Sequence, residues 1–256
     1  MLKINTPYPT KIIEMFKEYT HNIPVINSVL EGQYDGSVYV DDINTPGYVF
    51  LYTPFLFCFV SGDPSITGIE KALEELIFNE ILPIANEKEI VVFSPSSQWH
   101  HILKQVFDAH QGLTDYRRIF EFDPVSFFLS KEKYRSLPDG LRLCIKDVQD
   151  IPTSRKLYPS AQLWVNDMCV STCCAIMIGA GHAELDINTH SDYQGKGYAT
   201  YAAIALIDEL LQQNYIPCWS TWPYRVASQA VAKKVGFIRS IDTLAFIWTE
   251  QDCGKL

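Results

Sequence analysis

Two glycines stand close together in the segment His190–Ala199, between a strand-like run at 183–189 and a helical run at 199–214. Gly195 and Gly197 have no side chains, so the backbone here can approach a ligand closely. The first N–H groups of the following helix lack intrahelical acceptors and lie at the positive end of its dipole. The segment therefore predicts a cradle for a phosphate or pyrophosphate group. A tight turn that binds nothing is the alternative, since short glycine motifs recur by chance.

The charge balance of the chain is acidic. Lys and Arg number 21 and Asp and Glu number 30, which gives a formal net charge of -9. This is the wrong sign for a protein that coats nucleic-acid phosphates, so we expect no nucleic-acid partner. The charge mildly favours a cationic acceptor, although solubility alone is the simpler explanation.

The cysteines and the apolar runs indicate the compartment. The chain has 7 cysteines, an odd number without a repeated metal-knuckle spacing, which is typical of buried thiols in a reducing environment. The N-terminal residues show no secretory signal. The most apolar window, Val49–Val60, contains Pro54 and is shorter than the roughly 20 residues of a membrane span. We therefore expect a cytoplasmic protein that does not contact a membrane.

Apolar periodicity and turn residues divide the chain into two similar halves. The first half predicts helices at 10–19 and 23–30, strands at 37–40, 47–52 and 55–61, a helix at 66–85, a strand at 89–93, a helix at 96–107 and a strand at 116–122. The second predicts strands at 141–145, 162–165, 169–178 and 183–189, a helix at 199–214, a strand at 217–221, a helix at 226–235 and a strand at 243–248. Between 123 and 140 the pattern loosens around two prolines, which predicts a linker.

Both halves read three strands, helix, strand, helix, strand, which indicates a duplicated α/β architecture. Where the second half has its glycine segment, the first half has Gly62–Gly68, which contains Asp63 and Pro64. The proline removes one amide from any cradle at that position. We therefore expect one anion site per chain, and a first half that serves as a scaffold, a lid or part of an acceptor pocket.

Three features of the second half resemble the GNAT superfamily of N-acetyltransferases. The family's acyl-CoA signature is Gln or Arg, two residues, Gly, one residue, then Gly or Ala, and Gln194–Ala199 matches it throughout. An acidic strand precedes this segment, and Ala227–Phe237 resembles the second motif, a helix that ends in Gly-Phe. The resemblance covers about 141–248. The whole chain is similar to a bacterial subgroup in which a degenerate acetyltransferase-like half, here 1–125, precedes a catalytic half, here 136–256. It implies a mixed central α/β (α+β) sheet in tandem arrangement.

The resemblance implies transfer of an acetyl group from acetyl-CoA to an amine by direct attack in a ternary complex. The amides of 194–199 would bind the CoA pyrophosphate, and the edge of 187–189 would pair with the pantetheine arm. The implied cofactor-binding residues are Ile187, Asn188, Thr189, Gln194, Gly195, Lys196, Gly197, Tyr198, Ala199, Thr200 and Ser228.

The resemblance also implies catalytic residues. The family often places a carboxylate on the strand before the loop, so Glu184 is the expected general base, and Asp186, of the same side-chain parity, is the reserve. A carboxylate that merely bonds a neighbouring strand is the alternative. Ser228 is expected to contact the cofactor or assist the leaving thiolate, with helix packing as its alternative. The tyrosine that many members use as general acid is replaced by Ala232. Arg225 replaces a polar amide residue, and pairing with a CoA phosphate is one role for it.

The acceptor side departs from the family pattern. Some sixteen residues separate the strand at 141–145 from Gln162, too few for the two helices that usually border the acceptor. We therefore expect the acceptor, a small-molecule or peptide amine, to bind between the two halves. The sequence leaves the identity of the amine open, and it is compatible with a monomer or a homodimer.

Two other functions compete with this interpretation. A zinc deaminase is suggested by His182, Glu184 and Cys218, but Thr221 stands where that signature needs its last ligand, so we expect no metal. A non-catalytic acetyl-CoA sensor or regulatory module would keep the cradle and need neither base nor acid. Ala232 favours the sensor, whereas the two carboxylates on the preceding strand favour an enzyme.

Overall fold

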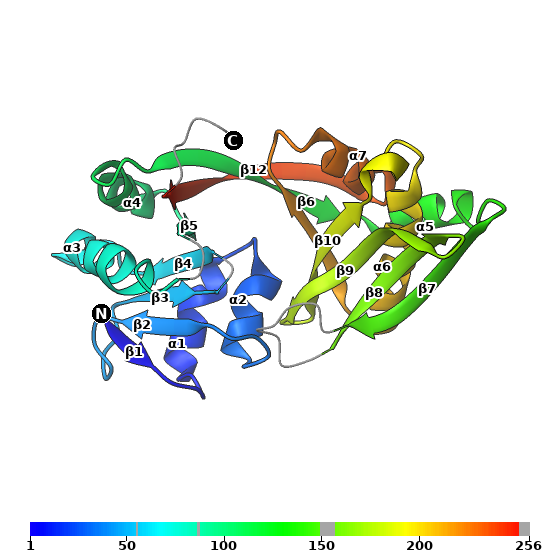
Figure 1. Ribbon diagram of the computed structural model, residues 1–256. Helices are drawn as coiled ribbons and strands as arrows, with labels where there is room; N and C mark the ends of the chain where they lie inside the picture. The colour runs from blue at the N-terminus through cyan, green and yellow to red at the C-terminus, as the bar shows by residue number, and fades with distance from the viewer. Residues whose placement is uncertain (55, 86–87, 149–156, 251–256) are drawn as a thin grey trace. The chain divides into compact units, whose positions relative to one another are not determined.

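Figure 1 shows a computed structural model of the chain, which describes residues 1–54, 56–85, 88–148 and 157–250. The chain forms two compact units. Unit 1 contains Met1–His21, Val29–Tyr116 and the chain from Thr243 onward, and unit 2 contains Asn22–Ser28 and Arg117–Asp242. Each unit is a mixed sheet covered by helices. Among the residues that the structure describes, every helix is too short or too polar to cross a membrane.

The sheet of unit 1 follows the chain in order. Its first five strands are β1 (Leu2–Ile4), β2 (Ser37–Val40), β3 (Tyr48–Tyr52), β4 (Phe57–Gly62) and β5 (Glu89–Phe93). Neighbours from β1 to β4 are antiparallel, whereas β4 and β5 are parallel. On its other side β5 pairs antiparallel with the second part of β12 (Phe237–Thr249), where Phe246 faces Val92.

The helices of unit 1 form where apolar residues recur at helical spacing. They are α1 (Thr10–Met15), the 3₁₀ helix η1 (Phe16–Glu18), α3 (Ile69–Glu74), its π-helical continuation η2 (Glu75–Ile81) and α4 (Gln98–Asp108). Leu73, Leu76 and Leu103 lie fully buried in one cluster with Phe50 and Trp99. The predicted helix at 66–85 is therefore confirmed as α3 and η2, although it begins at Ile69, behind Gly68 at φ 84°.

The sheet of unit 2 repeats this plan. It contains, in spatial order, β7 (Leu141–Val148), β8 (Tyr158–Val165), β9 (Met168–Gly179), β10 (His182–Thr189), β11 (Ile216–Thr221) and the second part of β6 (Leu113–Phe122). The pairs from β7 to β10 are antiparallel, β10 and β11 are parallel, and β11 and β6 are antiparallel. The turn between β8 and β9 has Asn166 at φ 53°, which confirms the predicted hairpin there.

Helices α6 (Tyr198–Gln212) and α7 (Val226–Lys234) share one core with the sheet of unit 2. The first residues of α2 (Ile23–Leu30) also belong to this unit. The small side chains of Ala202 and Ala203 are fully buried and let α6 lie close to the strands beneath it. They share a core with Leu206, Trp219 and Phe237.

Part of the last strand of each sequence half belongs to the other unit. β6 ends the first half, yet residues 118–120 pair with β11 in unit 2. β12 ends the second half, yet residues 246–249 pair with β5 in unit 1. Local periodicity identifies a strand but does not select its partner, so this exchange was not predicted. The halves 1–125 and 136–256 stay a prediction, because compactness does not show that either half is an independent domain.

The predicted linker at 123–140 is wrong over most of its length, because helix α5 occupies Pro124–Lys133. The carboxylate of Asp123 accepts a hydrogen bond from the Ser126 N–H at 2.8 Å, and Pro124 stands at the first helical position. Both residues favour a helix start. Phe127 is fully buried in the unit 2 core, so α5 belongs to that core.

Candidate functional site

Among the described residues, the parallel strands β10 and β11 pair only at their first residues. His182–Glu184 pair with Ile216–Cys218, and no later pair between the two strands occurs among the described residues. Beyond Glu184, β10 continues to Thr189 with β9 on one side only. The other edge of this segment therefore presents backbone N–H and C=O groups to an extended ligand.

The loop after β10 ends in glycines with left-handed backbone. Gly195 has φ 75°, and Gly197, the N-cap of α6, has φ 80°. Gln194 Nε2 donates to the Thr189 carbonyl at 3.1 Å, which ties the loop to the end of β10. Within the described part of the chain, the N–H groups of residues 195–197 donate to no acceptor. They are free to bind an anion at the positive end of α6.

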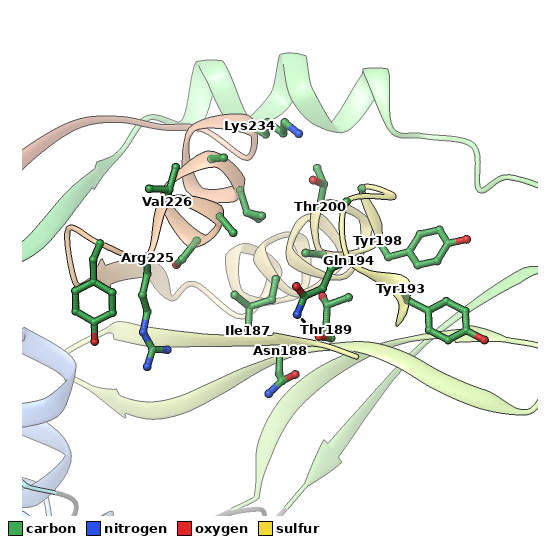
Figure 2. Close-up of a pocket in the computed structure, with 18 residues that line it drawn as sticks. Ile187, Asn188, Thr189, Tyr193, Gln194, Tyr198, Thr200, Arg225, Val226 and Lys234 are labelled. Carbon is green, nitrogen blue, oxygen red and sulfur yellow. Dashed lines mark hydrogen bonds between the residues drawn. The ribbon is translucent and has the colours of Figure 1, made fainter. Parts of the chain in front are cut away.

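A pocket of about 730 Å³ lies between the end of β10, this loop, the start of α6 and α7 (Figure 2). Ligand sites commonly have volumes of this order. Ten of the eleven predicted cofactor-binding residues line the pocket, and Lys196 is the exception. Its ammonium group instead lies 4.7 Å from the centre of the Tyr193 ring.

One face of α7 also lines the pocket and was not predicted. Its residues are Ala227, Ala230, Val231 and Lys234, joined by Tyr224 and Val226 before and at the helix start. The spacing of three and four residues between the α7 positions was a usable signal, since such positions share a helix face. Lys234 adds a positive charge to this wall.

Ser228 and Ala232 lie one helical turn apart on α7 and have different surroundings. The indole N–H of Trp219 donates to Ser228 Oγ at 3.1 Å, so the hydroxyl proton of Ser228 remains available to donate into the pocket. Ala232 is fully buried in the core cluster. The position at which the GNAT resemblance implies a tyrosine is therefore an alanine buried in the core of this protein.

Glu184 lies on the opposite side of β10 from the core residues Ala183 and Leu185, and is 6% exposed. The Ser220 hydroxyl donates to Glu184 Oε1 at 2.6 Å. Arg117 Nη2 donates to Ser220 Oγ at 3.1 Å and to the Ser220 carbonyl at 3.2 Å. Three strands, β6, β11 and β10, thus supply one hydrogen-bonded chain.

Burial dominates the electrostatics of this chain. Burial raises the pKa of the Glu184 carboxyl, while the Ser220 hydrogen bond and the positive charge of Arg117 oppose that rise. Burial also lowers the pKa of the Arg117 guanidinium, and the nearby charge of Glu184 opposes this effect. The exposed side chain of Asp186 contributes to the field at both groups. A buried carboxyl with a raised pKa is suited to general base catalysis near neutral pH.

The structure brings together some predicted site residues and separates others. Glu184 and Asp186 share one end of the gap between β10 and β11, while Ser228 lies in the pocket with the cofactor-binding set. Glu184 itself is not a pocket-lining residue. Arg117 and Ser220 were missed. The only sequence signal for Ser220 was its alternation with the buried residues Trp219 and Thr221.

The His, Cys, Asp and Glu side chains of the described residues do not gather into a metal-binding group. In the described ranges, no three His, Cys, Asp or Glu side chains are placed to hold a metal ion. His182, from the competing zinc signature, has its Nδ1 2.7 Å from the carbonyl of Ala180.

Known proteins share this sequence pattern and fold. The family model described as GNAT acetyltransferase matches residues 14–160 and 161–246. The uncharacterized N-acetyltransferase YdfB of Bacillus subtilis (strain 168) is 27% identical over 232 residues, which cover 83% of this chain and 85% of the relative.

Two solved structures have similar folds. A GCN5-related N-acetyltransferase-like protein from Streptococcus suis 89/1591 has a TM-score of 0.67 at 19% identity, covering 93% of this chain and 97% of its own. A tandem GNAT protein from the clavulanic acid biosynthesis pathway has a TM-score of 0.57 at 10% identity, covering 89% and 87%. These likenesses confirm the predicted mixed α/β fold and its tandem arrangement.

Proposed function

The chain belongs to the GNAT acetyltransferase family, and from this premise we propose that it is an N-acetyltransferase that moves an acetyl group from acetyl-CoA to an amine. The observation that carries the proposal is the continuity of one site in unit 2. A pocket of about 730 Å³ begins at free loop amides and follows the open edge of β10, and a buried carboxylate lies further back along the same strand.

The cofactor would bind along this path. The amides of residues 195–197 and the α6 dipole suit the pyrophosphate, and the edge of 187–189 suits the amide groups of the pantetheine arm. Figure 2 shows Arg225 on the other side of Ile187 from Gln194. Arg225 therefore lies away from the amide cradle, which argues against pairing with the pyrophosphate.

The chemistry requires three groups. The amine nitrogen attacks the thioester carbonyl carbon, the C–S bond breaks, and the amine loses a proton while the thiolate gains one. Glu184 would accept the amine proton through a water molecule, because its side chain is not on the pocket wall. A backbone N–H near Ile187 would polarise the carbonyl, and the Ser228 hydroxyl would donate to the leaving thiolate.

Calorimetric titration with acetyl-CoA, followed by a panel of amines with detection of free thiol, tests the proposal. We expect one acetyl-CoA to bind per chain and at least one amine to release thiol. A chain that binds no acyl-CoA would contradict the proposal. Desulfo-CoA, which keeps the pyrophosphate and lacks the thiol, is a suitable binding control.

A sensor or regulatory module is the second candidate, and the buried Ala232 is the observation that favours it. A sensor would bind acetyl-CoA with the same stoichiometry but release no thiol with any amine. A purified chain that releases thiol catalytically with one amine would exclude it.

A further inference from the structure

We propose that Arg117 and Ser220 are positioning residues that hold Glu184 ionised and oriented for proton transfer. This inference rests on the proposed function, in which Glu184 is the general base. Arg117 lies on β6, the strand that ends the first half of the sequence, but it belongs to unit 2 in the structure.

The direction of the hydrogen bonds supports this role. A guanidinium group only donates, so Ser220 Oγ accepts from Arg117 Nη2 at 3.1 Å and from Nε at 3.3 Å. The single hydroxyl proton of Ser220 is then directed to Glu184 Oε1, at 2.6 Å. A short hydrogen bond of this kind is strongest when the carboxylate is charged.

Arg117 is held in place by two further contacts. Its Nη2 donates to the Ser220 carbonyl at 3.2 Å, and its guanidinium carbon lies 5.0 Å from the centre of the Trp222 ring. Arginine favours such stacking because its planar group is weakly hydrated. The positive charge therefore has a defined position relative to the carboxylate.

The other groups around Glu184 do not supply this charge. Asp186 on β10 is acidic, and its charge opposes ionisation of Glu184. Cys218 on β11 is a thiol whose pKa is raised by burial, so it stays neutral. The β9 partner of Glu184 is Met177, which does not titrate. Burial and Asp186 thus both favour the protonated acid, which cannot accept a proton, and Arg117 opposes them.

Arg117 also has charged neighbours of its own. The positive charge of Arg225 lowers its pKa, whereas Tyr224 and Asp186 raise it. These groups modulate the field at Arg117 but leave its guanidinium charged, because arginine does not lose its proton in proteins.

Carbon-13 NMR of the full chain with labelled glutamate carboxyl groups tests the inference without any amine acceptor. The Glu184 signal is assigned by its loss in Glu184→Gln. We expect Arg117→Met to move the titration midpoint of Glu184 upward by roughly one pH unit or more, because an opposite charge at close range lowers a carboxyl pKa. Ser220→Ala should move it in the same direction by less.

Two further variants make the test specific. Arg117→Lys keeps the charge and should leave the midpoint closer to that of the wild type. Arg142→Met removes a different arginine, 4.9 Å from the Trp164 ring on β8, and should leave the midpoint unchanged. An unmoved midpoint in folded Arg117→Met overturns the inference. If that variant does not fold, an unmoved midpoint in Ser220→Ala does so.

Failure of this inference and failure of the proposed function are distinguishable. If the chain binds acetyl-CoA and transfers its acetyl group but Arg117→Met shows no midpoint shift, the proposed function stands and the positioning role of Arg117 and Ser220 is wrong. With an active amine, the acidic limb of kcat/KM should move to higher pH in Arg117→Met, while the Kd of acetyl-CoA stays the same. A fall in rate without movement of that limb would indicate a structural role and count against the proposal.

Discussion

Unit 1 and unit 2 each contain one pair of parallel strands that align over three residues, but different side chains occupy the space where the two strands separate. In unit 1, residues 57–59 pair with 91–93, and in unit 2, residues 182–184 pair with 216–218. The helix after the first strand of each pair is capped by a left-handed glycine, Gly68 at φ 84° and Gly197 at φ 80°. The two units therefore share a parallel strand pair and a left-handed glycine before the helix, and they differ in the side chains around these features.

In unit 1 the place where the strands diverge is filled by Tyr19. Its single hydroxyl proton is shared between the Val60 carbonyl on β4 and the Phe93 carbonyl on β5, whose oxygens lie 2.7 Å and 2.9 Å from the Tyr19 oxygen. By pair register, the residue that corresponds to Glu184 is Phe59, which stacks on Phe93 with ring centres 5.7 Å apart. Unit 1 uses this region as core, so the fold alone does not confer the chemistry.

The loops before the two helices differ in charge as well. In unit 1 the carboxylate of Asp63 accepts from the Ser65 N–H at 2.8 Å and from its hydroxyl at 2.7 Å. An acid thus occupies a backbone amide donor that an anion would need. The comparison teaches that two units with similar backbones differ in the side chains between their parallel strands: unit 1 fills this space with aromatic rings, whereas unit 2 places a carboxylate there.

The largest effect is expected for the carboxylate that unit 1 lacks. Glu184→Gln should lower kcat by about 10²- to 10⁴-fold, the usual contribution of a general base. The Kd of acetyl-CoA should change by less than about twofold by calorimetry, well under the tenfold that 1.4 kcal/mol would give, because Glu184 does not line the pocket. Asp186→Asn is the matched control and should have a smaller effect on kcat. An unchanged rate in Glu184→Gln would remove this residue from the mechanism.

The next effect compares the two capping glycines. Gly197→Asp should weaken acetyl-CoA binding by roughly 100-fold, because a carboxylate near the pyrophosphate repels it with an energy of a few kcal/mol. Chain neighbours apart, no heavy atom of the described residues lies within 4 Å of a Cβ added at Gly197 or Gly68, so the Cβ itself has room at both positions. Asparagine and aspartate both tolerate positive φ better than most residues.

Gly68→Asp supplies the matched substitution in unit 1 and should leave binding unchanged. Gly197→Asn separates charge from backbone strain and should bind much better than Gly197→Asp. Equal weakening by the two matched aspartates would mean that the cradle is not specific to unit 2.

The smallest effect concerns the residue that fills the gap in unit 1. Tyr19→Phe should lower the free energy of unfolding by about 1–3 kcal/mol, because two buried carbonyls lose their donor. Chemical denaturation measures this change. Tyr116→Phe, at a side chain that is 53% exposed, should have little effect. A stability loss for Tyr116→Phe equal to that for Tyr19→Phe would argue against the role assigned to Tyr19.

Much of the pocket in unit 2 was predictable from the sequence because most of its residues are local. Ten of its predicted members lie at 187–189, 194–195, 197–200 and 228, where one strand, one loop and two helix starts determine the geometry. The bounds of α2, β2 and β5 were also predicted correctly, since each has turn residues at both ends and a clear apolar pattern. The existence of α5 was missed, because the helix-start signal of Asp123 and Pro124 was outweighed by the loose periodicity around it.

The positioning pair was not predictable in the same way. Arg117 and Ser220 are 103 residues apart, and only the pairing of β6 with β11 brings them together. Strand pairing over such distances depends on the whole sheet rather than on local pattern. The acceptor site between the halves, the oligomeric state and the cytoplasmic location stay predictions.

The exchange of β6 and β12 has a consequence for how the chain is made. A ribosome synthesises β5 long before residues 246–249, which complete the sheet beside it in unit 1. β5 must therefore wait with an open edge until residues 246–249 are released, by which point unit 2, which extends to Asp242, has already been synthesised. Unit 1 is therefore completed after unit 2, and a chain stopped before Thr243 would leave the aromatic core of unit 1 exposed to aggregation.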